Sequence, residues 1–257
     1  RRRHTRLVSD WSSDVCSSDL QKIRELSKEK NVVIDYAMRY GNPSIKEKME
    51  QMQSMGCQNM IILPLYPQYA AATTATVCDE VYRSLMKMRW QPSLQIIPHY
   101  ESNPLYISAL KKSIDKALRK VSWKPDVIIA SYHGIPQKYF DKGDPYHCYC
   151  HKTTRLIKEK FDQVDIQTTF QSRFGPQEWL KPYTDKTIED LPDKGVKNLL
   201  VICPGFASDC VETLEEINIQ ARESFLEKGG KKFDLVPCLN DNSDHINLFE
   251  KLIRRFL

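Results

Sequence analysis

The sequence predicts an α/β protein in which parallel strands alternate with crossover helices. From Gln21 onward, short apolar runs rich in Val, Ile and Leu alternate with charged stretches that favour helix. This alternation is the pattern that a parallel sheet flanked by helices requires. The composition, with 41% hydrophobic and 28% charged residues in 257, is that of a globular chain. It excludes collagen-like, disordered and coiled-coil proteins.

Seven apolar runs are the expected strands, and charged stretches with helical character are the expected helices. The strands are Asn31–Met38, Met60–Leu65, Leu94–Pro98, Asp126–Ser131, Asp165–Phe170, Val196–Cys203 and Phe233–Pro237. The helices are Ser44–Met55, Thr76–Met88, Pro104–Lys120, Thr153–Phe161, Val211–Lys228 and Asp244–Leu257. Together they predict an open α/β architecture.

The pattern divides into two halves at Val121–Pro125, with three strands before this segment and four after it. Residues 1–20 have no amphipathic period and nearly repeat a Ser-Ser-Asp unit, so we expect an unrelated leader. We expect the first half to lack its N-terminal strand, and the chain to lack its true N-terminus. The expected parts are the leader 1–20, an N-terminal half 21–123, a C-terminal half 124–240 and a final helix 241–257 that can pack on the first half.

Charge and hydropathy limit the cellular location. The net charge of +5, without a long basic block, is compatible with an anionic ligand, with nucleic acid or with weak peripheral association with a membrane surface. No apolar run reaches the roughly 18 residues of a membrane span, and the basic N-terminus lacks the apolar stretch of a secretory signal. We therefore expect a cytoplasmic protein, or one at the inner face of the cytoplasmic membrane.

Polar residues that directly follow the strands are the first candidates for a site, because ligands of open α/β sheets bind beyond the carboxyl ends of the strands. His133 follows such a strand and precedes Gly134, which turns the chain and leaves the imidazole at the rim. There it can accept a proton or bind a divalent metal. A histidine hydrogen-bonded within a turn is the alternative interpretation.

An acidic group follows the strand that ends at Cys203. On an α-helix, Asp209, Glu212 and Glu216 fall within an arc of about 60°. These carboxylates can hold a cation, although a solvated acidic face at a helix start is the alternative.

Aromatic and cationic residues follow three other strands. They suit a flat, acidic, aromatic ligand, which they can hold by stacking and charge. The alternative is surface aromatics that cover the edge of a core. The candidates are Arg39, Tyr40, Tyr66 and Trp179.

The segment His147–His151 resembles half of a metal site, but Cys148 and Cys150 lack the spacing of zinc modules and have no second pair. We therefore expect structural cysteines, with iron–sulfur ligation as the less favoured alternative, and no permanently bound cofactor. No phosphate loop, G-x-G-x-x-G, G-x-S-x-G or H-E-x-x-H motif occurs, which counts against nucleotide and serine-hydrolase chemistry.

Three segments in this order resemble the signature blocks of the ferrochelatase family, most closely its Gram-negative bacterial members. They are Ser131–Pro136, Thr169–Gly175 and Cys203–Glu216. The likeness extends from about Gln21 to the C-terminus. It implies two Rossmann-like domains of the chelatase type and a lyase that inserts Fe²⁺ into protoporphyrin IX, the terminal step of haem synthesis.

The resemblance also implies roles for single residues. His133 matches the invariant histidine, Glu212 its paired glutamate, and Asp209 and Glu216 the acidic line beside it. The positions that line the porphyrin in the family correspond to Arg39, Tyr40, Trp179 and Phe206. Cys210 departs from the pattern, because some members carry histidine there.

The implied substrates are protoporphyrin IX and Fe²⁺, with no nucleic-acid partner, and the oligomeric state is left open. Three alternatives remain at this point: a related chelatase for coproporphyrin or a cobalt-corrin precursor, a non-catalytic porphyrin- or haem-binding fragment, and a generic nucleotide binder. The family's first strand and porphyrin-embracing lip have no counterpart in the sequence, so we expect weak catalysis by the chain as it stands.

Overall fold

The computed structural model describes residues 32–162 and 164–257. The expected leader and Asn31 lie outside these residues. The chain forms two compact units. Unit 1 contains the described residues up to Tyr100 together with Asp241–Leu257, and unit 2 contains Glu101–Asn240.

Unit 2 is built on a parallel sheet with strand order β4-β3-β5-β6. The strands are β3 (Val127–His133), β4 (Asp165–Gln171), β5 (Asn198–Ile202) and β6 (Lys232–Val236). Strand β3 pairs with β4 over its full length, so that His133 lies opposite Gln171. Because all four strands run the same way, their carboxyl ends share one edge of the sheet.

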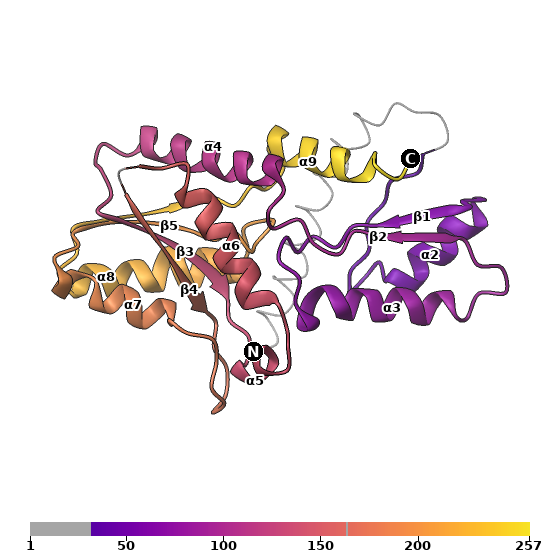
Figure 1. Ribbon diagram of the computed structural model, residues 1–257, viewed down its shortest axis with the longest axis horizontal. Coiled ribbons are helices and arrows are strands. Elements are labelled where there is room, and N and C mark those ends of the chain that lie inside the picture. Colours follow the sequence, from indigo (N-terminus) through magenta and orange to yellow (C-terminus); the bar gives the residue numbers. More distant parts are fainter. Residues whose placement is uncertain (1–31, 163) are drawn as a thin grey trace. The chain divides into compact units, whose positions relative to one another are not determined.

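Helices cover both faces of this sheet. They are α4 (Pro104–Lys120), α5 (Gln137–Asp141), α6 (Tyr146–Lys158), α7 (Thr184–Asp190), the short 3₁₀-helix η2 (Pro192–Lys194), the π-helix η3 (Glu212–Ala221) and α8 (Arg222–Glu227). Helices α4 and α6 contact each other on one face, and α7 and α8 contact each other on the opposite face (Figure 1). Unit 2 therefore has the three layers of a doubly wound α/β domain.

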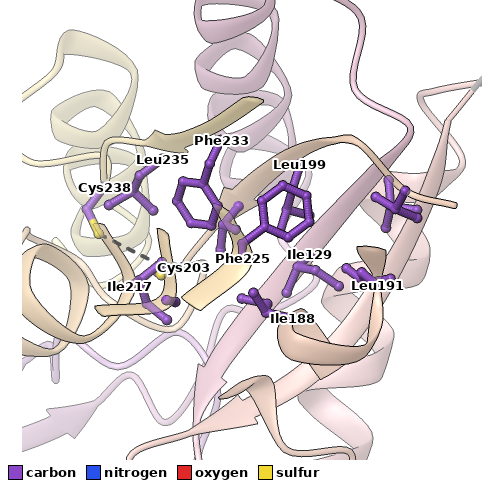
Figure 2. Close-up of a cluster of buried hydrophobic side chains, with 14 residues drawn as sticks. Ile129, Ile188, Leu191, Leu199, Cys203, Ile217, Phe225, Phe233, Leu235 and Cys238 are labelled. Carbon is purple, nitrogen blue, oxygen red and sulfur yellow. Dashed lines mark hydrogen bonds between the residues drawn. The ribbon is translucent and has the colours of Figure 1, made fainter. Parts of the chain in front are cut away.

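The core between the sheet and the second helix layer is apolar and closely packed. Figure 2 shows Phe225 of α8 beside Phe233 of β6, with ring centroids 6.1 Å apart. Ile129 and Leu199 from β3 and β5 are completely buried in the same cluster. Removing such residues from water is the main contribution to the stability of this layer.

Unit 1 contains a two-stranded parallel sheet of β1 (Asn59–Ile62) and β2 (Ser93–Ile96). Its helices are α2 (Ile45–Ser54), the π-helix η1 (Ala71–Ala75), α3 (Thr76–Leu85) and α9 (Ser243–Ile253). Ser44 caps α2 by accepting a hydrogen bond from the Glu47 N–H, as expected for a serine at a helix start. Apolar residues of α2, β1 and α3 form the core of unit 1.

Six of the expected strands are confirmed to within three residues at each end, but the first one is wrong. Residues 32–37 are not in a strand, and Met38 makes only an isolated bridge to Ser44. The Met38 N–H donates to the Pro43 carbonyl in a local turn. Val33 is 41% exposed, so this apolar run lacks the burial of a central strand.

The helices differ from expectation in three places. Helix α6 begins at Tyr146 rather than Thr153, and the short helices α5 and α7 lie in segments where none was expected. The boundary between the units lies before α4 rather than at residues 123–124, because α4 packs on α6 and β6. No helix in the described ranges is long and apolar enough to cross a bilayer.

Candidate active site

His133 is the last residue of β3 and the first one of that strand that is not fully buried. Its Nδ1 lies 2.7 Å from the carbonyl oxygen of Gly134. A carbonyl oxygen only accepts, so this contact assigns the proton of the neutral ring to Nδ1. The other nitrogen, Nε2, therefore carries a lone pair that can take a proton or bind a metal.

The turn after His133 requires glycine. The Gly134 N–H donates to the Gln171 carbonyl over 2.8 Å. A Cβ at Gly134 would lie 2.9 Å from that carbonyl oxygen and 3.2 Å from the Trp179 ring. Trp179 is itself buried, and its indole N–H donates to the Phe174 carbonyl. The imidazole is thus fixed by a turn that packs directly on its neighbours.

Two of the three predicted acidic residues lie on η3, where the end of β4 bonds to the main chain of Glu212 and to the carboxylate of Glu216. The Gln171 side-chain amide donates to the Glu212 carbonyl over 2.8 Å. The Ser172 hydroxyl donates to a Glu216 carboxylate oxygen over 2.5 Å. Ser172 has φ +61°, a left-handed conformation that costs a non-glycine residue about 1 kcal/mol or more. Ser172 adopts this left-handed conformation while its hydroxyl bonds to Glu216.

The expected α-helical arc of three carboxylates is wrong. Glu212 begins a π-helix, in which the hydrogen bond spans five residues instead of four. Asp209 precedes this helix. Its carboxylate accepts hydrogen bonds from the Asn240 side chain, the Thr213 hydroxyl and the Cys238 N–H. Asp209 therefore joins the loops that follow β5 and β6, while Glu212 and Glu216 belong to η3.

The thiols beside these carboxylates are held in the protonated form. Burial raises the pKa of Cys203 well above its ordinary value, and the charges of Asp209 and Glu216 act in the same direction. Burial and the Glu212 carboxylate raise the pKa of Cys210 to about 12. Without a bound metal, therefore, neither thiol is a thiolate at neutral pH.

Phe206 lies in the loop after β5, where its ring centroid is 6.5 Å from that of His133. Phe206 is partly buried and packs against the core cluster described above. This part of unit 2 therefore contains His133, Glu212, Glu216, Trp179 and Phe206, five of the residues singled out from the sequence.

The predicted residues of unit 1 form a group of their own. The Arg39 guanidinium lies over the Tyr40 ring at 4.4 Å and donates to the Thr76 carbonyl. Burial raises the pKa of Tyr66; the proximity of Tyr40 adds to this shift and Arg39 opposes it. Tyr40 is 76% exposed. A cation and two phenols are thus gathered on one unit.

No group of three His, Cys, Asp or Glu side chains is preformed for a metal ion within residues 32–162 and 164–257. The candidate metal ligands His133, Asp209, Glu212 and Glu216 do not form such a set. Cys148 is exposed and Cys150 is completely buried. Residues two apart on a helix point about 200° apart, so the two side chains leave α6 in nearly opposite directions.

Three residues of the site were missed by the sequence reasoning. Gln171 and Ser172 hold η3, and the Tyr146 hydroxyl donates to the His133 carbonyl over 2.9 Å. Gln171 and Ser172 directly follow the expected strand Asp165–Phe170, a position that signals a site residue. Nothing in the local sequence signals the contact of Tyr146, because it arises from the packing of α6 on β3.

The fold is that of the metal chelatases. SirB from Bacillus subtilis with Fe³⁺ superposes with a TM-score of 0.70 and 12% identity, over 95% of this chain and 89% of that one. A second structure, the sirohydrochlorin chelatase SirB from Bacillus subtilis subspecies spizizenii in complex with cobalt, gives a TM-score of 0.70 at 9% identity, over 95% and 88% of the two chains. These likenesses define the fold.

The sequence defines the family more narrowly. The family model described as Ferrochelatase matches residues 13–257, which includes part of the segment expected to be a leader. Ferrochelatase from Allorhizobium ampelinum is 51% identical over 96% of this chain and 75% of its own length. Ferrochelatase from Rhizobium meliloti is 55% identical over 88% and 67%. The chain belongs to the ferrochelatase family.

Proposed function

We propose that this chain inserts Fe²⁺ into protoporphyrin IX, with His133 as the proton acceptor and Glu212 and Glu216 as the transient oxygen ligands of the incoming metal. The observation that supports these roles is the hydrogen bonding at the end of β4. The Gln171 carbonyl accepts from the Gly134 N–H, and the Gln171 side chain donates to the main-chain carbonyl of Glu212. Ser172 donates to the Glu216 carboxylate, so the turn after His133 and the helix η3 are anchored to one strand end.

Metal insertion releases two protons from the two pyrrole N–H groups, while the charge of Fe²⁺ is balanced by the porphyrin dianion. In the proposal, Nε2 of His133 accepts the two pyrrole protons one after the other and passes each to solvent, because Nδ1 is already committed to the Gly134 carbonyl. A neutral imidazole with a fixed tautomer suits this role, since it needs no rearrangement before it accepts a proton.

The carboxylates suit a metal that must be bound and then released. Oxygen ligands bind Fe²⁺ more weakly than thiolates do, and the neighbouring thiols of Cys203 and Cys210 remain protonated. Glu216 is oriented by Ser172. The metal is therefore held by oxygen and nitrogen atoms that do not compete strongly with the porphyrin nitrogens.

The aromatic residues provide the surfaces for the macrocycle in this proposal. Trp179 is buried against Gly134, and Phe206 is backed by the core, so neither ring can yield when a porphyrin presses on it. Such rigid surfaces can favour a bent macrocycle over a flat one. Arg39, Tyr40 and Tyr66 are proposed to contact the porphyrin through charge and phenol groups.

The test is metal insertion by His133→Ala and Glu212→Gln, followed by the absorbance of the metalloporphyrin product. We expect each variant to lose at least about 100-fold in turnover, the usual contribution of a general base or a well-placed electrostatic group. Circular dichroism should be unchanged, because neither side chain is part of the core.

Matched controls are His99→Ala and Glu215→Gln. His99 is an exposed histidine of unit 1, and Glu215 is an exposed glutamate on η3. Both controls should retain turnover within about twofold. Near-normal insertion by His133→Ala or by Glu212→Gln would refute the assigned roles.

The same assay separates the substrates. Protoporphyrin IX, coproporphyrin and a cobalt-corrin precursor are each offered with Fe²⁺, Co²⁺ or Zn²⁺. Protoporphyrin IX with Fe²⁺ should give the highest turnover. A Soret shift without product would instead identify a porphyrin-binding chain that does not catalyse.

A further inference from the structure

Helix α6 carries two histidines that take no part in the proposed reaction. His147 and His151 are four residues apart, so they lie on one face of the helix. Their ring centroids are 4.3 Å apart, with an angle of 47° between the planes. Phe170 stacks on His147 at 5.7 Å, and Phe140 meets it edge-on at 5.0 Å. The aromatic rings restrict how far the imidazoles can turn.

Both imidazoles have nitrogens available for a ligand. Across the described ranges, neither ring makes a hydrogen bond to the protein. Burial lowers the pKa of His147, and burial together with His147 lowers the pKa of His151. The neutral form, which is the form that binds metals, therefore predominates at neutral pH.

The ring separation is close to that of two ligands on one metal. A nitrogen–metal bond of about 2.1 Å places the metal about 3.2 Å from each ring centroid. Two such ligands at 90° have centroids about 4.5 Å apart, and at the tetrahedral angle about 5.2 Å apart. The observed 4.3 Å is nearer to the 90° arrangement.

We propose that His147 and His151 chelate one divalent first-row transition-metal ion of octahedral or tetragonal preference, at a site separate from His133. Tyr132 bonds to Thr154 of α6, and Phe170 stacks on His147 of the same helix. The next residues along their strands, His133 and Gln171, point to the other side of the sheet because side chains alternate along a strand. The histidine pair is thus on the opposite side of the sheet from the proposed active site.

The coordination sphere of this site is completed by water. No third His, Cys, Asp or Glu joins the pair among the residues that the structure describes. The affinity of such a site for divalent metals should follow the general order for nitrogen and oxygen ligands. Cu²⁺ should therefore bind most tightly, Ni²⁺ less tightly and Co²⁺ more weakly still. The 90° geometry should disfavour tetrahedral Zn²⁺ relative to Ni²⁺.

Calorimetric titration of the full chain with Ni²⁺ tests the proposal. The chain should bind Ni²⁺ at a site that both His147→Ala and His151→Ala weaken by at least about tenfold, because either change removes one arm of the chelate. The Cu²⁺ complex should show the electron paramagnetic resonance pattern of two equatorial nitrogens, and one nitrogen in each variant. Alanine favours helix at both positions, so α6 is retained.

His99→Ala and His133→Ala are the controls, and both should keep this Ni²⁺ site. Equal Ni²⁺ affinity in wild type, His147→Ala and His151→Ala would overturn the proposal, as would a loss of the site in the His133→Ala control. Tighter binding of Zn²⁺ than of Ni²⁺ would overturn the assigned geometry.

Discussion

Gln171 provides the sharpest test of how the site is held. It is 5% exposed, and its amide joins three elements. The side-chain nitrogen donates to the Glu212 carbonyl at 2.8 Å, and the side-chain oxygen accepts from the Ser131 hydroxyl at 2.7 Å. The Gln171→Met variant keeps the length of the side chain and removes both of these hydrogen bonds, together with the weaker one that the Cys203 thiol donates to the same oxygen over 3.8 Å.

The expected loss in the free energy of unfolding depends on which groups lose a hydrogen-bond partner. The Ser131 hydroxyl still bonds to Thr184, so losing its hydrogen bond to Gln171 costs about 1 kcal/mol. The Glu212 carbonyl loses a buried donor, which costs about 1–3 kcal/mol. The free energy of unfolding should therefore fall by about 2–4 kcal/mol. With a urea dependence of about 3 kcal/mol per M, the midpoint falls by about 1 M.

Turnover should fall further than stability alone explains. A displacement of Glu212 by about 1 Å can cost about 100-fold in rate. The loss should appear in kcat, since Gln171 itself does not contact the substrate in the proposal. Metal insertion is measured in buffer, where the folded state still predominates.

Gln167→Met is the matched control, because Gln167 lies on the same strand and its side chain, among the residues that the structure describes, bonds only to Asp165 in an exposed contact. It should change the midpoint by less than about 0.3 M and leave turnover intact. If Gln171→Met behaves like Gln167→Met in both measurements, the idea that β4 holds η3 in place is wrong.

Three further predictions follow from single positions. Gly134→Ala should lower the free energy of unfolding in urea by about 1–3 kcal/mol and lower turnover more strongly, because the added Cβ lies 2.9 Å from a backbone carbonyl oxygen. Gly41→Ala should be nearly neutral, because its added Cβ comes no closer than 3.6 Å to another atom. Ser172→Ala and Ser172→Gly should lose equal activity because both lack the hydroxyl, but the glycine variant should be more stable by about 1 kcal/mol since it accepts φ +61°. Cys148→Ser should leave acid-labile sulfide and visible absorption unchanged in anaerobically purified protein, and Cys150→Ser should reduce stability because its side chain is completely buried.

The sequence predicted the sheet well because burial and chain direction are visible in it. The run at Asp126–Ser131 is mostly apolar, and Asp165–Phe170 combines Ile166 and Phe170 with two β-branched threonines. Strands β3 and β4 lie within two residues of these expected ends. The run Asn31–Met38 is also rich in strand-forming residues, but composition does not supply a hydrogen-bonded neighbour. A strand exists only where a second strand pairs with it, and that condition is not local.

The π-helix could not have been distinguished from an α-helix by spacing. The buried residues of η3 are Thr213, Ile217 and Ala221, which are four apart. A step of four residues turns the chain by about 400° in an α-helix and by about 330° in a π-helix. Either helix places these three side chains close to one face, so the hydrophobic pattern fits both.

The residues found from the sequence are those with reactive side chains, and the residues that were missed hold them in place. His133, Glu212 and Glu216 were visible because imidazole and carboxylate groups after strands suggest chemistry. Gln171 and Ser172 also follow an expected strand, but their amide and hydroxyl groups do not suggest chemistry by themselves. Nevertheless, this strand end fixes the turn after His133 and two points of η3. A shift of this strand end therefore displaces the imidazole and the carboxylates together.

This shared anchor has a consequence for double variants. Gln171→Met and Ser172→Ala both loosen η3, at adjacent residues of one strand end, so their effects on turnover should not add. Once the first substitution has allowed η3 to move, the second substitution should displace it little further. The combined variant should lose clearly less than the product of the two single losses. Full additivity would mean that Gln171 and Ser172 act on Glu212 and Glu216 independently, and that the two carboxylates are positioned separately.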